Sequence, residues 1–226
     1  MSVAPAFALI ETLAAVDGEP RHLDRHLARL ARSARELGFA LDAEAARTHL
    51  TEEARRSVAA ETKTDRGGVH ADLGAGILRL QLERDGSFAL TTRPLTVQTG
   101  PVRLAIDSVP VDPDAVIVRH KTTDRAHLDA ARERHPGADD VIVLGRDGRV
   151  AETTIANLAV RVDGAWVTPP VPDGCLPGIG REIALADGRV SERSITVDEL
   201  RAAEAIALVS SVRGWREARL LHGARA

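Results

Sequence analysis

Lysine is rare in this sequence, and its rarity draws attention to one position. Of the 30 basic residues, only Lys63 and Lys121 are lysines, and the other 28 are arginines. Lys63 lies in a polar stretch typical of a solvated loop, whereas Lys121 lies between a strand-like run at 115–120 and a helix-like run at 122–134. An amine that must lose its proton to attack a carbonyl cannot be replaced by guanidinium. Lys121 is therefore a candidate nucleophile, although most lysines are surface charges.

Other polar residues lie where strands and helices are expected to begin or end. Gly178 and Gly180 precede an expected helix, so backbone amides there could bind an anion, although such loops are more often simple turns. Ser210 and Ser211 end an apolar strand and could donate to a phosphate or cap the strand. Glu152 lies near the start of a half-buried strand, where its partner is either a protonated ring nitrogen or, more commonly, a surface arginine.

One arginine completes the set of candidate groups. Arg29 lies at the flank of the leucine stripe of an expected helix, and periodicity alone predicts a solvated side chain. Together the sequence offers an amine, a carboxylate, an arginine, a glycine loop at a helix start and a hydroxyl. Pyridoxal phosphate (PLP) needs such groups, because the amine holds its aldehyde, the carboxylate keeps its ring nitrogen protonated and the others hold its phosphate.

The composition is that of a globular protein with one large domain or two small ones. The 226 residues are 44% hydrophobic and 28% charged. A net charge of -3 and an aromatic content of 2% argue against nucleic acid and anionic membranes as partners. The single cysteine, Cys175, excludes an internal disulfide, and the Cys and His spacing predicts no metal site. No leader or membrane-spanning run is visible, so we expect a cytoplasmic protein.

The first half of the chain predicts hairpins and helices. Residues 7–23 indicate two strands joined at Asp17-Gly18, a dipeptide typical of a hairpin turn. Leucines at helical spacing predict a helix from an N-cap at Asp24 to a stop at Gly38, and a second helix is expected after Asp42. A second hairpin is expected over residues 77–97, after a polar loop at 61–76.

The second half begins with a change in composition. Prolines and a new strand follow Thr99-Gly100, so we expect an N-terminal domain over 1–99 and a larger C-terminal domain over 100–226. This half is then expected to contain three strand-like runs between residues 139 and 170 and a helix after the glycine loop. A capping-box pair follows at Thr196 and Glu199, and the last element is a strand that ends in a polar loop. The whole predicts an α+β fold with mostly antiparallel strands and flanking helices.

Seven segments in a fixed order resemble the class IV aminotransferase family, the fold-type IV PLP enzymes. The family includes branched-chain and D-amino acid aminotransferases and 4-amino-4-deoxychorismate lyase. The resemblance implies a small N-terminal α/β domain, a larger C-terminal domain, a cofactor cleft between them, and a homodimer. The matching segments run from about residue 7 to 219: "IETL", "HLARLARSARELGF", "RHKTTDR", "ETTIANLAV", "GAWVTPP", "CLPGIGRE" and "LVSSVRGW".

The same resemblance implies a role for each matching residue. Lys121 matches the catalytic lysine that binds the aldehyde of PLP, and Glu152 matches the glutamate that pairs with the pyridine nitrogen. Thr12 and Arg79 fall where the family lines its substrate pocket. The remaining matches are ligands of the cofactor phosphate: Arg29, Ile179, Gly180 and Ser211.

The sequence also departs from the family pattern in two places. The family's usual opening strand with an Asn-Gly turn is absent, and Gly180 stands where a hydroxyl residue often donates to the phosphate. The short start and the wording of the motifs are most similar to the lyase segment fused to aminodeoxychorismate synthase in some bacteria. A lyase that releases pyruvate and forms 4-aminobenzoate for folate synthesis, with such a synthase as partner, is therefore expected. A PLP transaminase of branched-chain or D-amino acids and a non-catalytic relative are the alternatives.

Overall fold

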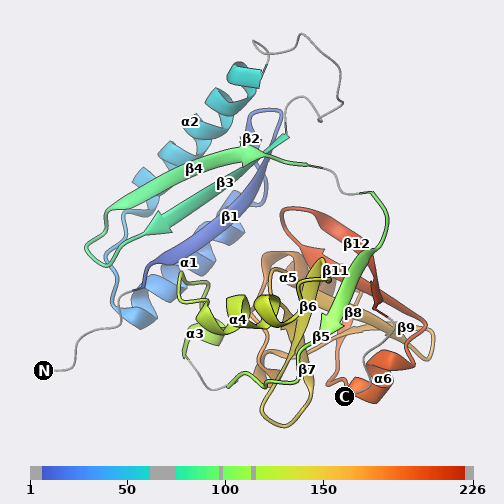
Figure 1. The fold of residues 1–226 in the computed structure, drawn as a ribbon. Helices are drawn as coiled ribbons and strands as arrows, with labels where there is room; N and C mark the ends of the chain where they lie inside the picture. Colours follow the sequence, from blue (N-terminus) through green and yellow to red (C-terminus); the bar gives the residue numbers. More distant parts are fainter. Residues whose placement is uncertain (1–6, 62–74, 97–98, 113–115, 222–226) are drawn as a thin grey trace, which may run out of the picture. The chain divides into compact units, whose positions relative to one another are not determined.

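The chain folds into two compact units that are interleaved in sequence. The computed structural model describes residues 7–61, 75–96, 99–112 and 116–221 (Figure 1). The first unit comprises Met1–Gln98 with Lys121–Asp124, and the second comprises Thr99–His120 with Arg125–Ala226. The four residues from Lys121 therefore group with the first unit although their chain neighbours on both sides group with the second. A single domain boundary after residue 99 stays a prediction.

The first unit is built on a four-stranded sheet in the order β2-β1-β3-β4. The predicted turn at Asp17-Gly18 is confirmed, because both residues have the positive φ, 53° and 78°, that this hairpin turn requires. The second predicted hairpin is confirmed as the antiparallel pair of β3 and β4. The strands are β1 (Leu9–Val16), β2 (Glu19–Pro20), β3 (Ala75–Leu82) and β4 (Phe88–Pro94).

Two helices pack against this sheet, α1 (Leu23–Leu37) and α2 (Ala43–Glu61), and leucines and alanines from both bury a common core with β1 and β3 (Figure 1). The helix α1 begins after His22, so the predicted N-cap at Asp24 is wrong by two residues, whereas Gly38 ends the helix as predicted. Asp42 precedes α2 and accepts a hydrogen bond from the Ala45 amide at 2.9 Å. The predicted loop at 61–76 lies largely outside the described residues.

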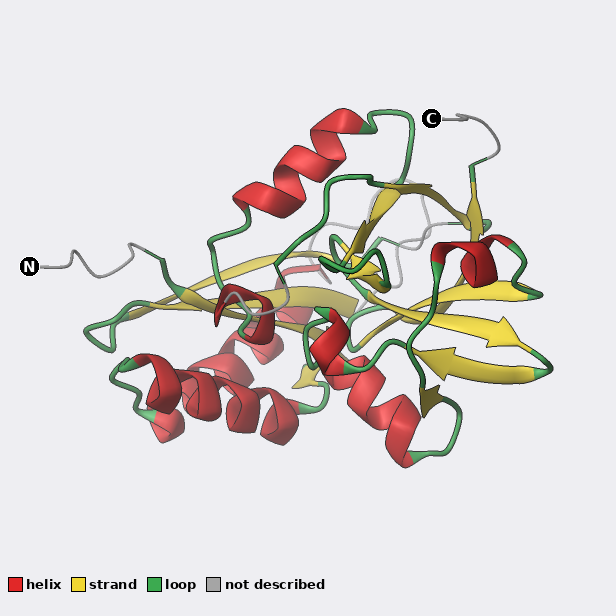
Figure 2. Cartoon of the chain, turned by 90° about the horizontal axis from the view of Figure 1, so that it is seen from below, coloured by secondary structure: helices red, strands yellow, loops and turns green. Residues whose placement is uncertain are grey.

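The second unit is built on an eight-stranded sheet in the order β10-β9-β8-β11-β12-β5-β6-β7. The sheet curls around an apolar core of valines, leucines and isoleucines (Figures 1 and 2). Four of its ladders are antiparallel and three are parallel. The strands are β5 (Val102–Ile106), β6 (Asp140–Leu144), β7 (Val150–Thr153), β8 (Asn157–Val162), β9 (Ala165–Thr168), β10 (Ser191–Glu192), β11 (Ala205–Ser210) and β12 (Gly214–Leu220).

Two strand predictions need correction in this unit. The three runs expected between residues 139 and 170 are four strands, because a turn at Thr154–Ala156 interrupts the strand and separates β7 from β8. The break arises where the Thr153 side chain and amide both bond to Ala156, which closes a local turn instead of extending the strand. The expected final strand, β11, is followed by β12, which pairs with it in antiparallel fashion.

The strand-like run before Lys121 is also corrected. Val116–Arg119 forms the short helix α3, because a brief apolar run cannot be assigned to strand or helix by periodicity and tertiary context overrides β-branched propensity. The capping box at Thr196 and Glu199 is confirmed, with both reciprocal hydrogen bonds present at the start of α6 (Val197–Arg201). The other helices are α4 (Ala126–Arg134), α5 (Ile179–Ala186) and the 3-10 turn η1 (Val171–Asp173).

Candidate active site

Lys121 lies along β1 of the first unit. The Ile10 amide donates to the Lys121 carbonyl at 2.8 Å, and Thr122 forms an antiparallel bridge with Leu9. The Thr123 amide donates to the Ala8 carbonyl at 2.9 Å. This register sets Lys121 directly across from Ile10, so the two side chains share one face of the sheet.

Two further predicted residues share that face. Thr12 and Arg79 are direct partners across β1 and β3. Because side chains alternate along a strand, Thr12 lies on the same face as Ile10, and Leu9 and Leu13 point into the helix-covered core on the other face. The structure therefore brings Lys121, Thr12 and Arg79 to one face of the first unit's sheet.

Arg29 lies on the opposite, helix-covered side of the sheet. Its exposed fraction is 4%, so the expectation of a solvated side chain is wrong. The Arg29 guanidinium donates to both carboxylate oxygens of Glu11, from Nε at 2.9 Å and from Nη2 at 2.6 Å. A bidentate contact of this kind fixes the plane of the guanidinium as well as its position. Helical periodicity could not reveal it, because the partner carboxylate comes from β1.

A histidine completes this buried charge cluster. His26 Nδ1 lies 2.6 Å from Glu11 Oε2, and His26 Nε2 is buried with no hydrogen-bond partner among the described residues. Burial alone would raise the pKa of Glu11, but the charge of Arg29 and the hydrogen bonds from His26 and Arg29 lower it to about 2. Glu11 is therefore ionised at neutral pH, and sequence reasoning missed both Glu11 and His26 as members of the buried cluster around Arg29.

In the second unit, a single asparagine organises the region around Glu152. Asn157 Nδ2 donates to Glu152 Oε2 at 3.2 Å and to the Leu176 carbonyl at 2.9 Å. Asn157 is 5% exposed and begins β8, directly across from Val209 of β11. It is the only asparagine of the sequence. The rarity argument that singled out Lys121 would have singled out Asn157 as well.

Two glycines allow the start of α5 to approach this asparagine and the end of β11. A Cβ at Gly178 would lie 2.0 Å from Asn157 Oδ1, and a Cβ at Gly180 would lie 2.5 Å from the carbonyl carbon of Ser210 and 2.8 Å from the Ser211 nitrogen. A larger residue at Gly180 would require a shift of the backbone, and one at Gly178 would displace the Asn157 side chain. Close packing against Ser210 and Ser211 is thus a physical reason for glycine at position 180, in place of a residue with a hydroxyl.

The polar groups gathered at the start of α5 are of the kinds that can bind a phosphate and a cationic ring nitrogen. The first amides of a helix have no intrahelical acceptor, and Gly178 as N-cap offers no side-chain cap to α5. The Ser211 backbone nitrogen lies against this helix start, next to Gly180. The four residues predicted from the second unit thus form one cluster joined through Asn157: Glu152, Ile179, Gly180 and Ser211.

The neighbouring thiol reports the electrostatics of the cluster. Cys175 is 1% exposed and donates to the Pro169 carbonyl at 3.4 Å. Burial, together with the negative charge of Glu152, raises the pKa of the Cys175 thiol to about 12. The thiol is therefore protonated and inert, and the chemistry of the site falls to other groups.

Within the described ranges, no group of three or more His, Cys, Asp or Glu side chains could hold a metal ion, and no helix is long and apolar enough to cross a membrane.

Comparisons with known proteins agree over nearly the whole chain. The family model for amino-transferase class IV matches residues 8–221. A Schizosaccharomyces pombe protein named "Putative aminodeoxychorismate lyase" is 28% identical over 209 residues, which cover 87% of this chain and 83% of that protein. The structure of a fold IV transaminase from Curtobacterium pusillum is 29% identical with a TM-score of 0.78, over 96% of this chain and 80% of the other. A PLP-bound "hypothetical aminotransferase" of Mycobacterium tuberculosis is 27% identical with a TM-score of 0.76, over 100% of this chain and 87% of the other.

Proposed function

Because the chain belongs to the class IV aminotransferase family of PLP-dependent lyases and transaminases, we propose that it is a 4-amino-4-deoxychorismate lyase. The observation that carries the proposal is the second-unit cluster, in which Asn157 joins Glu152 to the glycine-bounded start of α5. The choice of a lyase over a transaminase is supported by the relative of that name, which matches 87% of this chain. The released products would be pyruvate and 4-aminobenzoate.

The residues of the second unit would hold the cofactor. In this proposal the amides of Ile179 and Gly180 and the hydroxyl of Ser211 bind the phosphate, and Glu152 pairs with the protonated ring nitrogen. In this proposal the Asn157 amide, which donates to Glu152 Oε2 at 3.2 Å, helps to orient the carboxylate toward the ring nitrogen. When bound, PLP supplies a ring that accepts electrons from the substrate carbon bearing the amino group.

The residues of the first unit would hold and deprotonate the substrate. Lys121 would hold the cofactor through its aldehyde, and once the substrate amine had replaced it there, the freed Lys121 amine would accept the proton from the substrate carbon that bears the nitrogen. Thr12 and Arg79, which share a sheet face with Lys121, contact the substrate. Arg29 supplies a further phosphate contact, with its guanidinium oriented by Glu11. A homodimer, a synthase partner, a cytoplasmic location and a division into domains 1–99 and 100–226 belong to the same proposal.

The proposal is tested by spectrum and product together. The purified protein is titrated with PLP, and its visible absorption is compared with that of Lys121→Ala and of Lys63→Ala, the variant of the one other lysine. We expect the band of lysine-bound PLP in the wild type and in Lys63→Ala but not in Lys121→Ala. Pyruvate release from aminodeoxychorismate should need no keto acid, and Lys121→Arg should slow it at least about 10³-fold despite its retained charge.

Two results would contradict the proposal at different levels. A band that persists in Lys121→Ala would remove Lys121 from its role. Pyruvate release that depends on an added keto acid, with amino transfer to that acid, would establish the transaminase alternative instead.

A further inference from the structure

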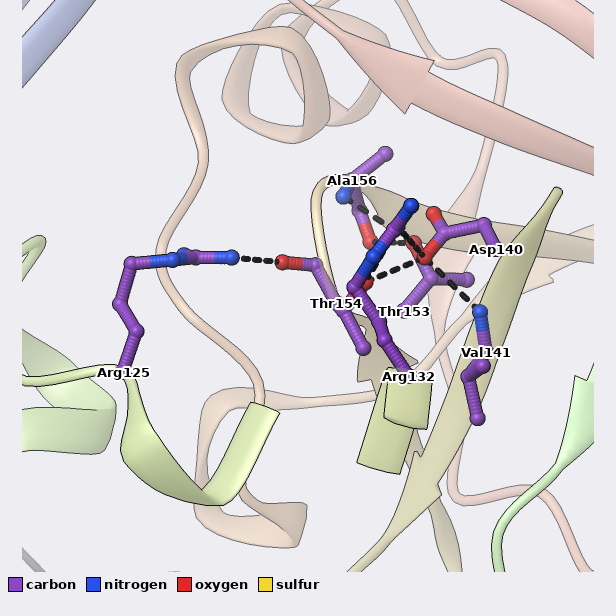
Figure 3. Close-up of polar contacts among 7 residues, drawn as sticks. All are labelled: Arg125, Arg132, Asp140, Val141, Thr153, Thr154 and Ala156. Carbon is purple, nitrogen blue, oxygen red and sulfur yellow. Dashed lines mark hydrogen bonds and ion pairs between the residues drawn. The ribbon is translucent and has the colours of Figure 1, made fainter. Parts of the chain in front are cut away.

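The turn between β7 and β8 carries Glu152 at one end and Asn157 at the other. Thr153 closes this turn: its hydroxyl donates to the Ala156 carbonyl at 2.9 Å and accepts from the Ala156 amide at 3.0 Å (Figure 3). The Thr153 amide also donates to the Ala156 carbonyl, at 2.9 Å. The turn is therefore locally rigid, and its orientation depends on what holds its middle residue, Thr154.

All three polar groups of Thr154 are held by neighbouring elements. The Thr154 amide donates to the Val141 carbonyl of β6 at 3.0 Å. The Thr154 hydroxyl donates to Asp140 Oδ1 and accepts from Arg132 Nη1 of α4 at 3.2 Å. The Thr154 carbonyl accepts from Arg125 Nη2 at 2.6 Å (Figure 3). Four residues from three segments thus converge on one threonine.

A buried carboxylate, Asp140, lies beside Thr154 in this network. Asp140 is 1% exposed, and its Oδ1 accepts from Thr154 and from the Val141 amide. Its Oδ2 is buried and has no hydrogen-bond partner in the described part of the chain. Asp140 Oδ1 also lies 3.5 Å from Arg132 Nη1, so the carboxylate holds both the Thr154 hydroxyl and the guanidinium that donates to it.

Arg125 links this turn to the segment that carries the lysine. In the chain, Arg125 follows Lys121 by four residues, and Thr154 follows Glu152 by two. Arg125 is also the first residue that groups again with the second unit after Lys121–Asp124. Its charge-assisted hydrogen bond therefore fixes the end of the lysine segment at the turn that follows the glutamate.

We propose that Arg125 is a positioning residue, which through the Thr154 carbonyl ties the chain that follows the Lys121 segment to the turn that follows Glu152. The inference rests on the proposed roles of Lys121 and Glu152. A displacement of about 1 Å between reacting groups can cost about 100-fold in rate, whereas binding of substrate is less sensitive. The loss of this hydrogen bond should therefore appear in kcat before it appears in KM.

The test compares Arg125→Leu and Arg125→Lys with Arg134→Leu. Arg134 lies on α4 and makes a bidentate contact with the buried carboxylate of Asp107, away from Thr154. Its variant therefore controls for the loss of a guanidinium contact from the same region. Each protein is measured for the rate at which the visible band of lysine-bound PLP forms, for kcat and KM of pyruvate release, and for its urea midpoint.

We expect Arg125→Leu to form the band and turn over about 10- to 100-fold more slowly, with KM within about threefold of the wild type. Arg125→Lys should recover most of the loss, because an ammonium can still donate to the Thr154 carbonyl. Arg134→Leu should lower the urea midpoint at least as much with kcat nearly unchanged. A kcat for Arg125→Leu within twofold of the wild type, or an equal loss in Arg134→Leu, would overturn the inference. A wild-type protein with neither band nor turnover would overturn the proposed function itself, and the inference with it.

Discussion

The two units hold their functional charges in different ways. In the first unit, Glu11 meets opposite charge directly, because two guanidinium nitrogens of Arg29 lie 2.6 and 2.9 Å from its oxygens, and a ring nitrogen of His26 lies 2.6 Å from one of them. In the second unit, Glu152 accepts from a neutral amide, Asn157, which at the same time holds the Leu176 carbonyl. A direct ion pair compensates a buried charge, whereas a neutral amide donor orients a carboxylate without adding charge of its own.

A substitution of one of these partners should therefore have a different effect in each unit. Removal of one member of a buried ion pair leaves its partner charged and desolvated, so the cost falls on folding. Removal of a neutral donor takes one hydrogen bond from the carboxylate but leaves no unpaired positive charge, so we expect the main effect on the orientation of the carboxylate. Variants in the first unit should therefore show their largest effects on stability, and variants in the second unit on cofactor binding.

The largest effect is expected for Glu11→Gln. This variant keeps the size of the side chain but leaves the 4%-exposed Arg29 without its carboxylate. We expect a loss of about 3 to 5 kcal/mol in the free energy of unfolding, measured by urea denaturation at pH 7. Glu44→Gln is the control: the Glu44 side chain is 86% exposed and 3.9 Å from Arg47, so its loss should fall below about 0.5 kcal/mol.

The same pair predicts a pH dependence with a definite sign. The pKa of Glu11 is lowered from 4.5 to about 2 by folding, so its contribution is complete above pH 4.5 and is lost as the pH falls toward 2. The shift corresponds to about 3 kcal/mol, which the wild type should lose from its free energy of unfolding as the pH falls from 4.5 toward 2, and which Glu11→Gln should not lose. An equal loss of unfolding free energy in the two proteins over this pH range would contradict an ionised Glu11 in the fold.

Gly180→Ala probes the second unit with an intermediate effect. The added Cβ would lie 2.5 Å from the Ser210 carbonyl carbon, so the start of α5 must move away from the end of β11. We expect a loss of about 1 to 3 kcal/mol in unfolding free energy, together with weaker PLP binding. Gly137→Ala is the matched control, because no heavy atom lies within 4 Å of its added Cβ. Wild-type PLP affinity in Gly180→Ala would separate the close approach from the phosphate site.

Local chemistry explains which features of the fold the sequence predicted. Asp17-Gly18 and the capping box at Thr196 and Glu199 were predictable, because each depends on the φ preference or hydrogen bonds of residues within a few positions. Lys121 was singled out by the rarity of lysine in an arginine-rich chain, and its chemical role stays a prediction. Asn157 carries the same signal, although its link between Glu152 and Leu176 becomes visible only in the fold.

Nonlocal contacts explain what the sequence did not predict. Arg29 was expected in solvent because helical periodicity describes only its own helix, and the carboxylate that buries it comes from β1. Val116–Arg119 was expected as a strand because its apolar run is too short for periodicity to distinguish a strand from a helix. The grouping of Lys121–Asp124 with the first unit follows from hydrogen bonds to Ala8 and Ile10, more than 100 residues earlier in the chain.

Asn157→Ala should give the smallest change in stability and so separates the two kinds of site most cleanly. The variant removes the donor to the Leu176 carbonyl and to Glu152, which should cost about 1 to 2 kcal/mol in unfolding free energy by urea denaturation. Thr168→Val is the control, because it removes a buried 2.7 Å hydrogen bond to the Leu158 carbonyl without touching Glu152. The two variants should lose similar stability, but only Asn157→Ala should weaken PLP binding, measured by titration of the visible band. Equal PLP affinities would mean that the neutral donor serves folding alone, and the contrast between the two units would disappear.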